Sequence, residues 1–66
     1  MSAPKLLEPS RHEFLKGLTD GRKTAAGCVD AADAIWHQKV VFDNLRTSRP
    51  YYVDGFVAAF AERSAS

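Results

Sequence analysis

The chain has 66 residues, of which 45% are hydrophobic and 26% are charged, and its formal net charge is +1. This composition is typical of one folded domain and excludes a disordered chain, while the small net charge lacks the basic excess of dedicated nucleic-acid-binding domains. No apolar run approaches the about 20 residues that a membrane-spanning helix needs. The one cysteine, Cys28, excludes an intramolecular disulfide and, without a second cysteine, zinc fingers and zinc ribbons.

The small size of the chain predicts that a partner supplies part of its stability. A chain of about 60 residues buries only about 60% of the surface that its unfolded form exposes. Natural proteins of this size usually add disulfides, a metal or a second chain. Because no disulfide can form here, we expect a homodimer or a complex with a larger protein. The first seven residues lack the long apolar core and the cleavage site of a signal peptide, so we expect a cytoplasmic protein with no membrane contact.

The first predicted helix spans residues 10–20 and follows an N-terminal arm, residues 1–9. Ser10 and Glu13 have the spacing of a capping box, in which two side chains satisfy backbone N–H groups at the start of a helix. Gly21 predicts the end of this helix, because glycine accepts the left-handed conformation that is common after a helix. The apolar face that we expect to be buried consists of Phe14, Leu15 and Leu18.

A long central helix is predicted over residues 23–46, since this segment contains no proline and only Gly27 as a weak helix former. Toward its end, Trp36 and Val40 extend the apolar character around most of the circumference, which indicates burial on more than one side. A short strand at residues 39–42 is the alternative, which β-branched residues favour but which has no partner strand. At about 100° per residue, one side of the helix collects Cys28, Ala32, Ile35, Phe42 and Leu45.

The third predicted helix spans residues 50–63 and is followed by a frayed tail, residues 64–66. Pro50 suits the first turn of a helix and disfavours helical geometry at the residue before it, so we expect the chain to break at residues 47–49. The predicted fold is all-α: a small three-helix domain with a long central helix, dimeric or bound to a partner. The i, i+3, i+4, i+7 spacing of a buried stripe is formed by Val53, Phe56, Val57 and Phe60, and Tyr52 and Ala59 widen this stripe.

No catalytic, cofactor-binding or metal-binding site is predicted, and we expect a protein that is not an enzyme. Cys28 and His37 are a conceivable nucleophile pair, but nine residues on a continuous helix place them on opposite faces. Asp30, Asp33 and His37 share a polar stripe that we interpret as solvated surface, with a divalent metal as the alternative. We do not interpret the G-x-x-x-G pattern at residues 17–21 as a helix-association motif, because it indicates such association only inside an apolar membrane span.

DNA binding is the alternative function. The segments at residues 14–18, 24–26 and 49–52 resemble small phage-type helix-turn-helix proteins, such as terminase small-subunit domains. This resemblance implies a DNA-binding fold of three short helices. That family has a glycine-containing turn into its recognition helix. At this place the chain has residues 30–33, Asp-Ala-Ala-Asp, whose negative charges repel the phosphates of DNA. The basic residues that would contact DNA are Arg22, Lys23, Lys39 and Arg46.

Protein binding is the function that the residues favour. A three-helix core is expected to enclose Phe14, Leu18, Ile35, Phe42, Phe56 and Phe60. Apolar residues that cluster outside a core mark an interaction site, and interface hot spots are enriched in Trp, Tyr and Arg. We therefore expect a small regulatory or adaptor protein, of the kind that bacteria and phages encode, that binds a larger protein. For Trp36, a place in the core and a place in the interface are both open alternatives. The predicted contact residues are Trp36, Val40, Tyr51 and Tyr52, with Arg46 and Arg49 at the rim.

Overall fold

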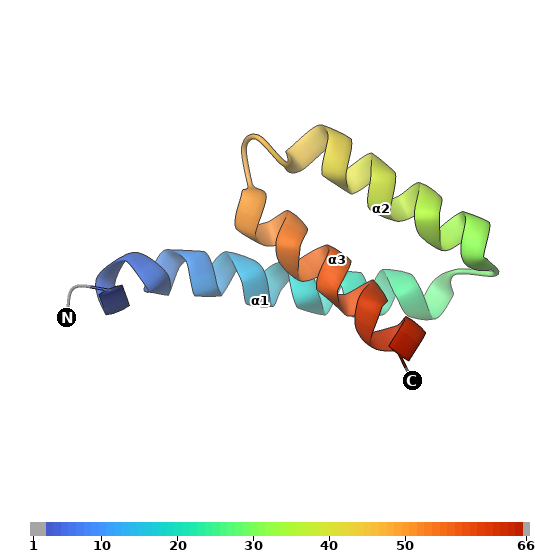
Figure 1. Cartoon of the computed structure of the whole chain (residues 1–66), viewed down its shortest axis with the longest axis horizontal. Helices are drawn as coiled ribbons and strands as arrows, with labels where there is room; N and C mark the ends of the chain where they lie inside the picture. The colour runs from blue at the N-terminus through green and yellow to red at the C-terminus, as the bar shows by residue number, and fades with distance from the viewer. Residues whose placement is uncertain (1–2, 66) are drawn as a thin grey trace.

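Three helices form the fold in the computed structural model, which describes the backbone of residues 3–65 and the side chains of residues 10–63. Helix α1 spans Ala3–Gly27, α2 spans Ala31–Leu45 and α3 spans Pro50–Ala65. Helix α3 crosses α1, whereas α2 begins beside the end of α1 and lies close to α3 only toward the loop that joins these two helices (Figure 1). The all-α class is confirmed, and the alternative of a strand at residues 39–42 is excluded, because that segment lies inside α2.

Helix α1 is longer than the sequence analysis predicts at both ends. Residues 3–9, predicted as part of an arm, are helical, whereas residues 1 and 2 lie outside the described residues. The predicted end at Gly21 is wrong, because the helix continues to Gly27 and no glycine among residues 3–65 has a positive φ. The capping box is also wrong: Ser10 lies inside α1, and the Glu13 carboxylate binds Arg49.

The long central helix is wrong as well, because the chain breaks between α1 and α2 at residues 28–30. Asp30 has extended backbone angles and caps α2, where its side chain accepts a hydrogen bond of 2.8 Å from the Asp33 backbone N–H. A capping side chain satisfies one of the N–H groups that the first turn of a helix leaves without a partner. The longest helix is therefore α1, with 25 residues, and α2 has 15.

Helix α3 begins at Pro50, where the sequence analysis places it, and extends through Ser64 and Ala65 of the predicted tail. Proline is at home in the first turn of a helix because its missing N–H would have no partner there. The Arg49 carbonyl accepts a hydrogen bond of 3.1 Å from the Val53 N–H, and this bond ties the break to the first turn of α3. Within the described residues, no helix combines the length and apolar character that crossing a membrane requires.

Glycines bring α1 and α3 into backbone contact. Gly17, Gly21 and Gly55 are all buried. A Cβ atom added to Gly17 would overlap the Tyr52 carbonyl oxygen, and one added to Gly55 would overlap the Phe14 carbonyl oxygen. The G-x-x-x-G pattern at residues 17–21 therefore has a structural role outside a membrane, which corrects the sequence analysis. Small residues at a helix contact allow the two backbones to approach closely.

The buried core lies between α1 and α3 and is mainly aromatic. Phe56 stacks between Tyr52 and Phe60, with ring centres 6.3 and 5.3 Å away. None of the 15 residues of α2, all of which the structure describes, is buried. Ile35 and Phe42, predicted as core residues, are exposed instead, because α2 turns Val41 and Leu45 toward the core. Of the predicted buried face of α1, Phe14 and Leu18 are half-buried and Leu15 is exposed.

A polar clamp of four residues, Glu13, Asp20, Arg49 and Tyr52, joins α1 to the start of α3. The Tyr52 hydroxyl donates a hydrogen bond to an Asp20 carboxylate oxygen. The Arg49 Nε–H donates to Glu13 Oε1 at 2.9 Å, and the guanidinium carbon lies 4.2 Å from the centre of the Tyr52 ring. The hydrogen bond and charge of Arg49 hold the pKa of Glu13 below its usual value, although burial opposes this effect. Burial of the phenol, with the Asp20 hydrogen bond second, raises the pKa of Tyr52 to about 12.

The clamp predicts a loss of stability at alkaline pH. Because folding raises the pKa of Tyr52, its stabilising contribution is complete below the unfolded value of about 10 and is lost as pH rises toward 12. We expect Tyr52→Phe to cost about 1–2 kcal/mol at pH 8, since it leaves Asp20 without its donor. Urea unfolding at pH 8 and at pH 11.5 should show the two proteins converging in stability at the higher pH. A difference that stays constant between the two pH values would contradict the assignment.

Candidate functional site

The predicted contact residues occupy three different environments. Trp36 and Val40, on the same side of α2, are 58% and 37% exposed. Tyr51 is exposed at the start of α3, where it lines a shallow hollow with Phe14 of α1. Tyr52 is only 8% exposed, so its prediction as a contact residue is wrong for the folded chain: its ring packs in the core and its hydroxyl is held by Asp20.

Helix α2 carries two apolar strips on different sides. The outer strip consists of Trp36 and Val40, and the inner strip consists of Ile35 and Phe42, which are 63% and 43% exposed. At about 100° per residue, the two strips are separated by about 130° around the helix. The inner strip borders a hollow of about 420 Å³ whose far wall is Val57 of α3. Apolar side chains therefore face solvent on two sides of α2.

The predicted rim residues have partners of their own. The Arg46 guanidinium carbon lies 5.2 Å from the centre of the Phe42 ring, which places this cation beside the inner strip. Arg49 is half-buried and belongs to the polar clamp, so it holds α3 to α1. Of the two, Arg46 is thus the residue that the structure places next to an exposed apolar surface.

The basic residues predicted for DNA binding are partly neutralised by acidic neighbours. Arg22 donates two hydrogen bonds of 3.0 Å to the Glu62 carboxylate, and these bonds lower the pKa of Glu62. Lys39 Nζ lies 3.5 Å from Asp43 Oδ2, while Lys23 is exposed. Because a carboxylate cancels the local charge of two of the four predicted residues, the arrangement does not favour phosphate binding.

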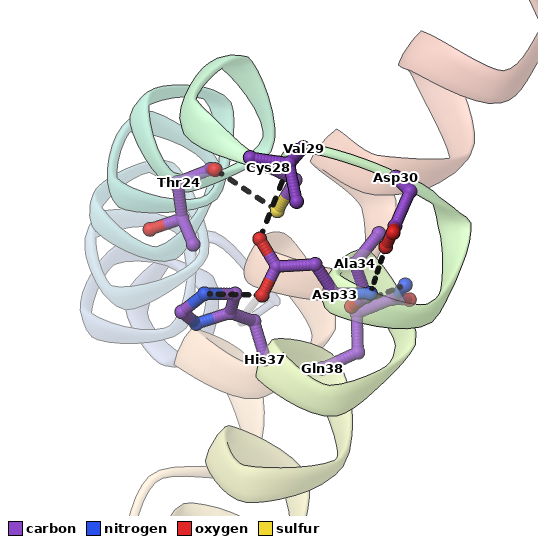
Figure 2. Close-up of polar contacts among 8 residues, drawn as sticks. All are labelled: Thr24, Cys28, Val29, Asp30, Asp33, Ala34, His37 and Gln38. Atoms are coloured by element: carbon purple, nitrogen blue, oxygen red, sulfur yellow. Dashed lines mark hydrogen bonds and ion pairs between the residues drawn. The ribbon is translucent and has the colours of Figure 1, made fainter.

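The break between α1 and α2 brings together three side chains that the sequence analysis separates. Figure 2 shows Cys28, Asp33 and His37 converging at this junction. One ligand atom of each lies within 4.8 Å of the others, and all three side chains are half-buried. The predicted separation of Cys28 from His37 is wrong because it assumed a continuous helix. The capping spacing of Asp30 and Asp33, which begins three residues after Gly27, is the sequence signal that reveals the break.

The contacts of this cluster keep the thiol protonated. The Cys28 thiol donates to the Thr24 carbonyl oxygen at 3.2 Å (Figure 2). Desolvation by burial raises the pKa of Cys28, and the negative charge of Asp33 raises it further. A nucleophilic cysteine needs the opposite environment, in which nearby positive charge stabilises the thiolate. The environment of Cys28 therefore does not favour a catalytic nucleophile.

Comparisons with protein-family profiles, with curated proteins and with solved structures find no significant match to this chain. The resemblance of residues 14–18, 24–26 and 49–52 to phage-type helix-turn-helix proteins consequently stays a prediction from the sequence. Two surfaces of the folded chain are candidates for function: the apolar strips of α2 and the cluster at the α1–α2 junction.

Proposed function

We propose that the protein is a small, non-enzymatic regulatory or adaptor protein that binds a larger protein through α2. The observation that carries this proposal is the exposure of α2: none of its described residues is buried, yet it displays Ile35, Trp36, Val40 and Phe42. Clustered, exposed apolar side chains usually mark an interaction surface. Adaptors and inhibitors of this size are of the kind that bacteria and phages encode.

The partner that fits both strips of α2 is a protein with an apolar groove. A second copy of the chain would bring one convex helix against another and cover one strip of each. A groove encloses a helix from two sides and so covers the outer and inner strips together, as in the helix-in-groove mode of peptide recognition. The lone tryptophan, Trp36, is the natural anchor, since tryptophan dominates many interface hot spots.

Two features favour tight binding once the partner is met. Helix α2 is already capped by Asp30 and joined to its neighbours at both ends, so binding does not have to meet the cost of folding a helix. Arg46 lies over Phe42, where it forms a cationic rim beside the inner strip. We place this activity in the cytoplasm, where a free thiol such as Cys28 stays reduced.

The test uses one variant for each strip. Trp36→Ala alters the outer strip and Ile35→Ala the inner strip, and neither side chain is buried in the folded chain. A protein retained by the tagged chain from a nuclease-treated lysate of its host is purified, and its affinity for each variant is measured by calorimetry. We expect Trp36→Ala to weaken binding at least about 30-fold, and Ile35→Ala to weaken it by a smaller but clear factor. Circular dichroism should show unchanged helix content.

Leu15→Ala is the matched control, because Leu15 is 47% exposed but lies on α1. It should leave the affinity unchanged. Undiminished binding by Trp36→Ala would contradict the proposal. Loss of all partners after nuclease treatment would support DNA binding instead. A homodimer that Trp36→Ala dissociates in sedimentation, while Ile35→Ala does not, would make a second copy the occupant of the outer strip.

A further inference from the structure

We propose that Cys28, Asp33 and His37 bind one divalent transition-metal ion, with zinc as the best-fitting ion, at the junction of α1 and α2. The three side chains offer a sulfur, a carboxylate oxygen and an imidazole nitrogen within 4.8 Å of one another. These are the three donor types that zinc sites in proteins use. None of the three ligands belongs to the apolar strips of α2, although Trp36 of the outer strip contacts His37.

The spacing of the donors suits a tetrahedral ion. With metal–ligand distances of about 2.0–2.3 Å, neighbouring donors of a tetrahedral zinc site lie about 3.4–3.6 Å apart. His37 Nε2 and Asp33 Oδ1 already lie 3.5 Å apart. The Cys28 sulfur lies within 4.8 Å of one carboxylate oxygen of Asp33 and of one ring nitrogen of His37. Three protein ligands leave a fourth position for solvent or for a group of another molecule.

Surrounding contacts orient the donors. The backbone N–H of Val29 donates to the second oxygen of the Asp33 carboxylate, Oδ2, at 3.2 Å, and so leaves Oδ1 directed at His37 (Figure 2). The cap at Asp30 holds the backbone of Asp33 in place. The rings of Trp36 and His37 meet edge to face, with centres 5.0 Å apart, which restricts the imidazole. Such outer contacts raise metal affinity because less side-chain freedom is lost on binding.

Metal binding releases one proton, which comes from the Cys28 thiol. The Cys28 thiol loses its proton to solvent as the sulfur–metal bond forms, while His37 supplies a lone pair of a ring nitrogen and Asp33 supplies a carboxylate oxygen. The charged groups that act on the sulfur are Asp30 and Asp33 from the start of α2 and Arg63 from α3. Affinity should therefore rise with pH, because the metal competes with the proton for the sulfur.

The test is titration of the full chain with Zn²⁺ in the presence of a thiol-free reductant, followed by calorimetry. We expect one ion per chain, a dissociation constant of about 1 µM or tighter and release of about one proton. Co²⁺ should give the intense tetrahedral absorption bands and a sulfur-to-cobalt charge-transfer band. The bound ion should also raise the melting temperature, because it ties α1 to α2.

Cys28→Ser and His37→Gln should each weaken zinc binding by about 100-fold or more, and Cys28→Ser should abolish the charge-transfer band. Circular dichroism of both variants checks that α1 and α2 remain folded. The matched control is His12→Gln, because His12 is an exposed histidine of α1 outside the cluster. It should bind zinc as the unaltered chain does. Absence of one-to-one binding, or an equal loss in His12→Gln, would overturn the proposal.

Discussion

Gly55→Ala should destabilise the protein by about 3 kcal/mol, although alanine is the better helix former. The added methyl group would overlap the Phe14 carbonyl oxygen and lie 2.9 Å from the Leu18 backbone nitrogen. Backbone atoms inside a helix cannot turn aside as a side chain can, so α1 and α3 have to separate. Overpacking of this kind typically costs about 1–3 kcal/mol and occasionally more. The separation would also loosen the aromatic core beneath it, which places the expected value at the upper end.

Gly27→Ala is the matched control for this prediction. Gly27 ends α1 with no described atom within 4 Å of an added Cβ, and its φ is not positive. The substitution should therefore be neutral, or stabilise by up to about 1 kcal/mol through the better helix propensity of alanine. Thermal and urea unfolding followed by circular dichroism measure both variants. Equal stabilities for Gly55→Ala and Gly27→Ala would contradict the close contact between the two helices.

Phe56→Ala should cost about 3–5 kcal/mol, which is enough to unfold most of a marginally stable chain of this size. Phe56 is 4% exposed and its ring packs against both Tyr52 and Phe60. Truncation removes the central ring of this stack and leaves a cavity that the fixed backbones of α1 and α3 prevent from closing. In thermal or urea unfolding, Phe56→Ala should lose the cooperative unfolding transition or show a large fall in the midpoint of that transition.

Phe42→Ala provides the comparison for Phe56→Ala, since it removes the same side chain from α2. Phe42 is 43% exposed, and the structure gives its ring a contact with the Arg46 guanidinium. We expect a cost below about 1 kcal/mol, typical of a surface substitution. A cost close to that of Phe56→Ala would show that α2 is buried in solution, and hence that a second copy of the chain covers the inner strip.

The sequence predicts α3 well because its signals are local. Pro50 starts the helix, and the i, i+3, i+7 spacing of Val53, Phe56 and Phe60 identifies three residues that are buried. The same spacing extended backward includes Tyr52, four residues before Phe56, and leaves Tyr51 outside the stripe. Tyr52 and Ala59, which widen the predicted stripe, are both buried, so the stripe distinguishes the buried tyrosine from the exposed Tyr51.

The boundaries of α1 and α2 are mispredicted because glycine has two opposite uses. Gly21 looks like the end of a helix, but it continues α1 and gives room to Phe56 and Ala59 of α3. Gly27 looks like a weak interior residue, yet it ends the helix. The local sequence pattern cannot distinguish these two uses of glycine. The use of Gly21 depends on residues of α3 that lie more than thirty residues later in the chain. The cluster of Cys28 with His37 is missed for the same reason, because it exists only where the helix breaks.

The glycine contact between α1 and α3 also affects how freely the sequence can change. Stability depends largely on Gly17, Gly21 and Gly55 and on the aromatic core, whereas the residues of α2 that face solvent contribute little to it. Substitutions that alter recognition often carry a penalty in stability when the same side chains serve both purposes. In this protein the proposed contact residues lie on α2, whereas the glycine contact and the aromatic core lie on α1 and α3. The surface of α2 can therefore be re-engineered, or diversified in a library, while the scaffold that holds it keeps its stability.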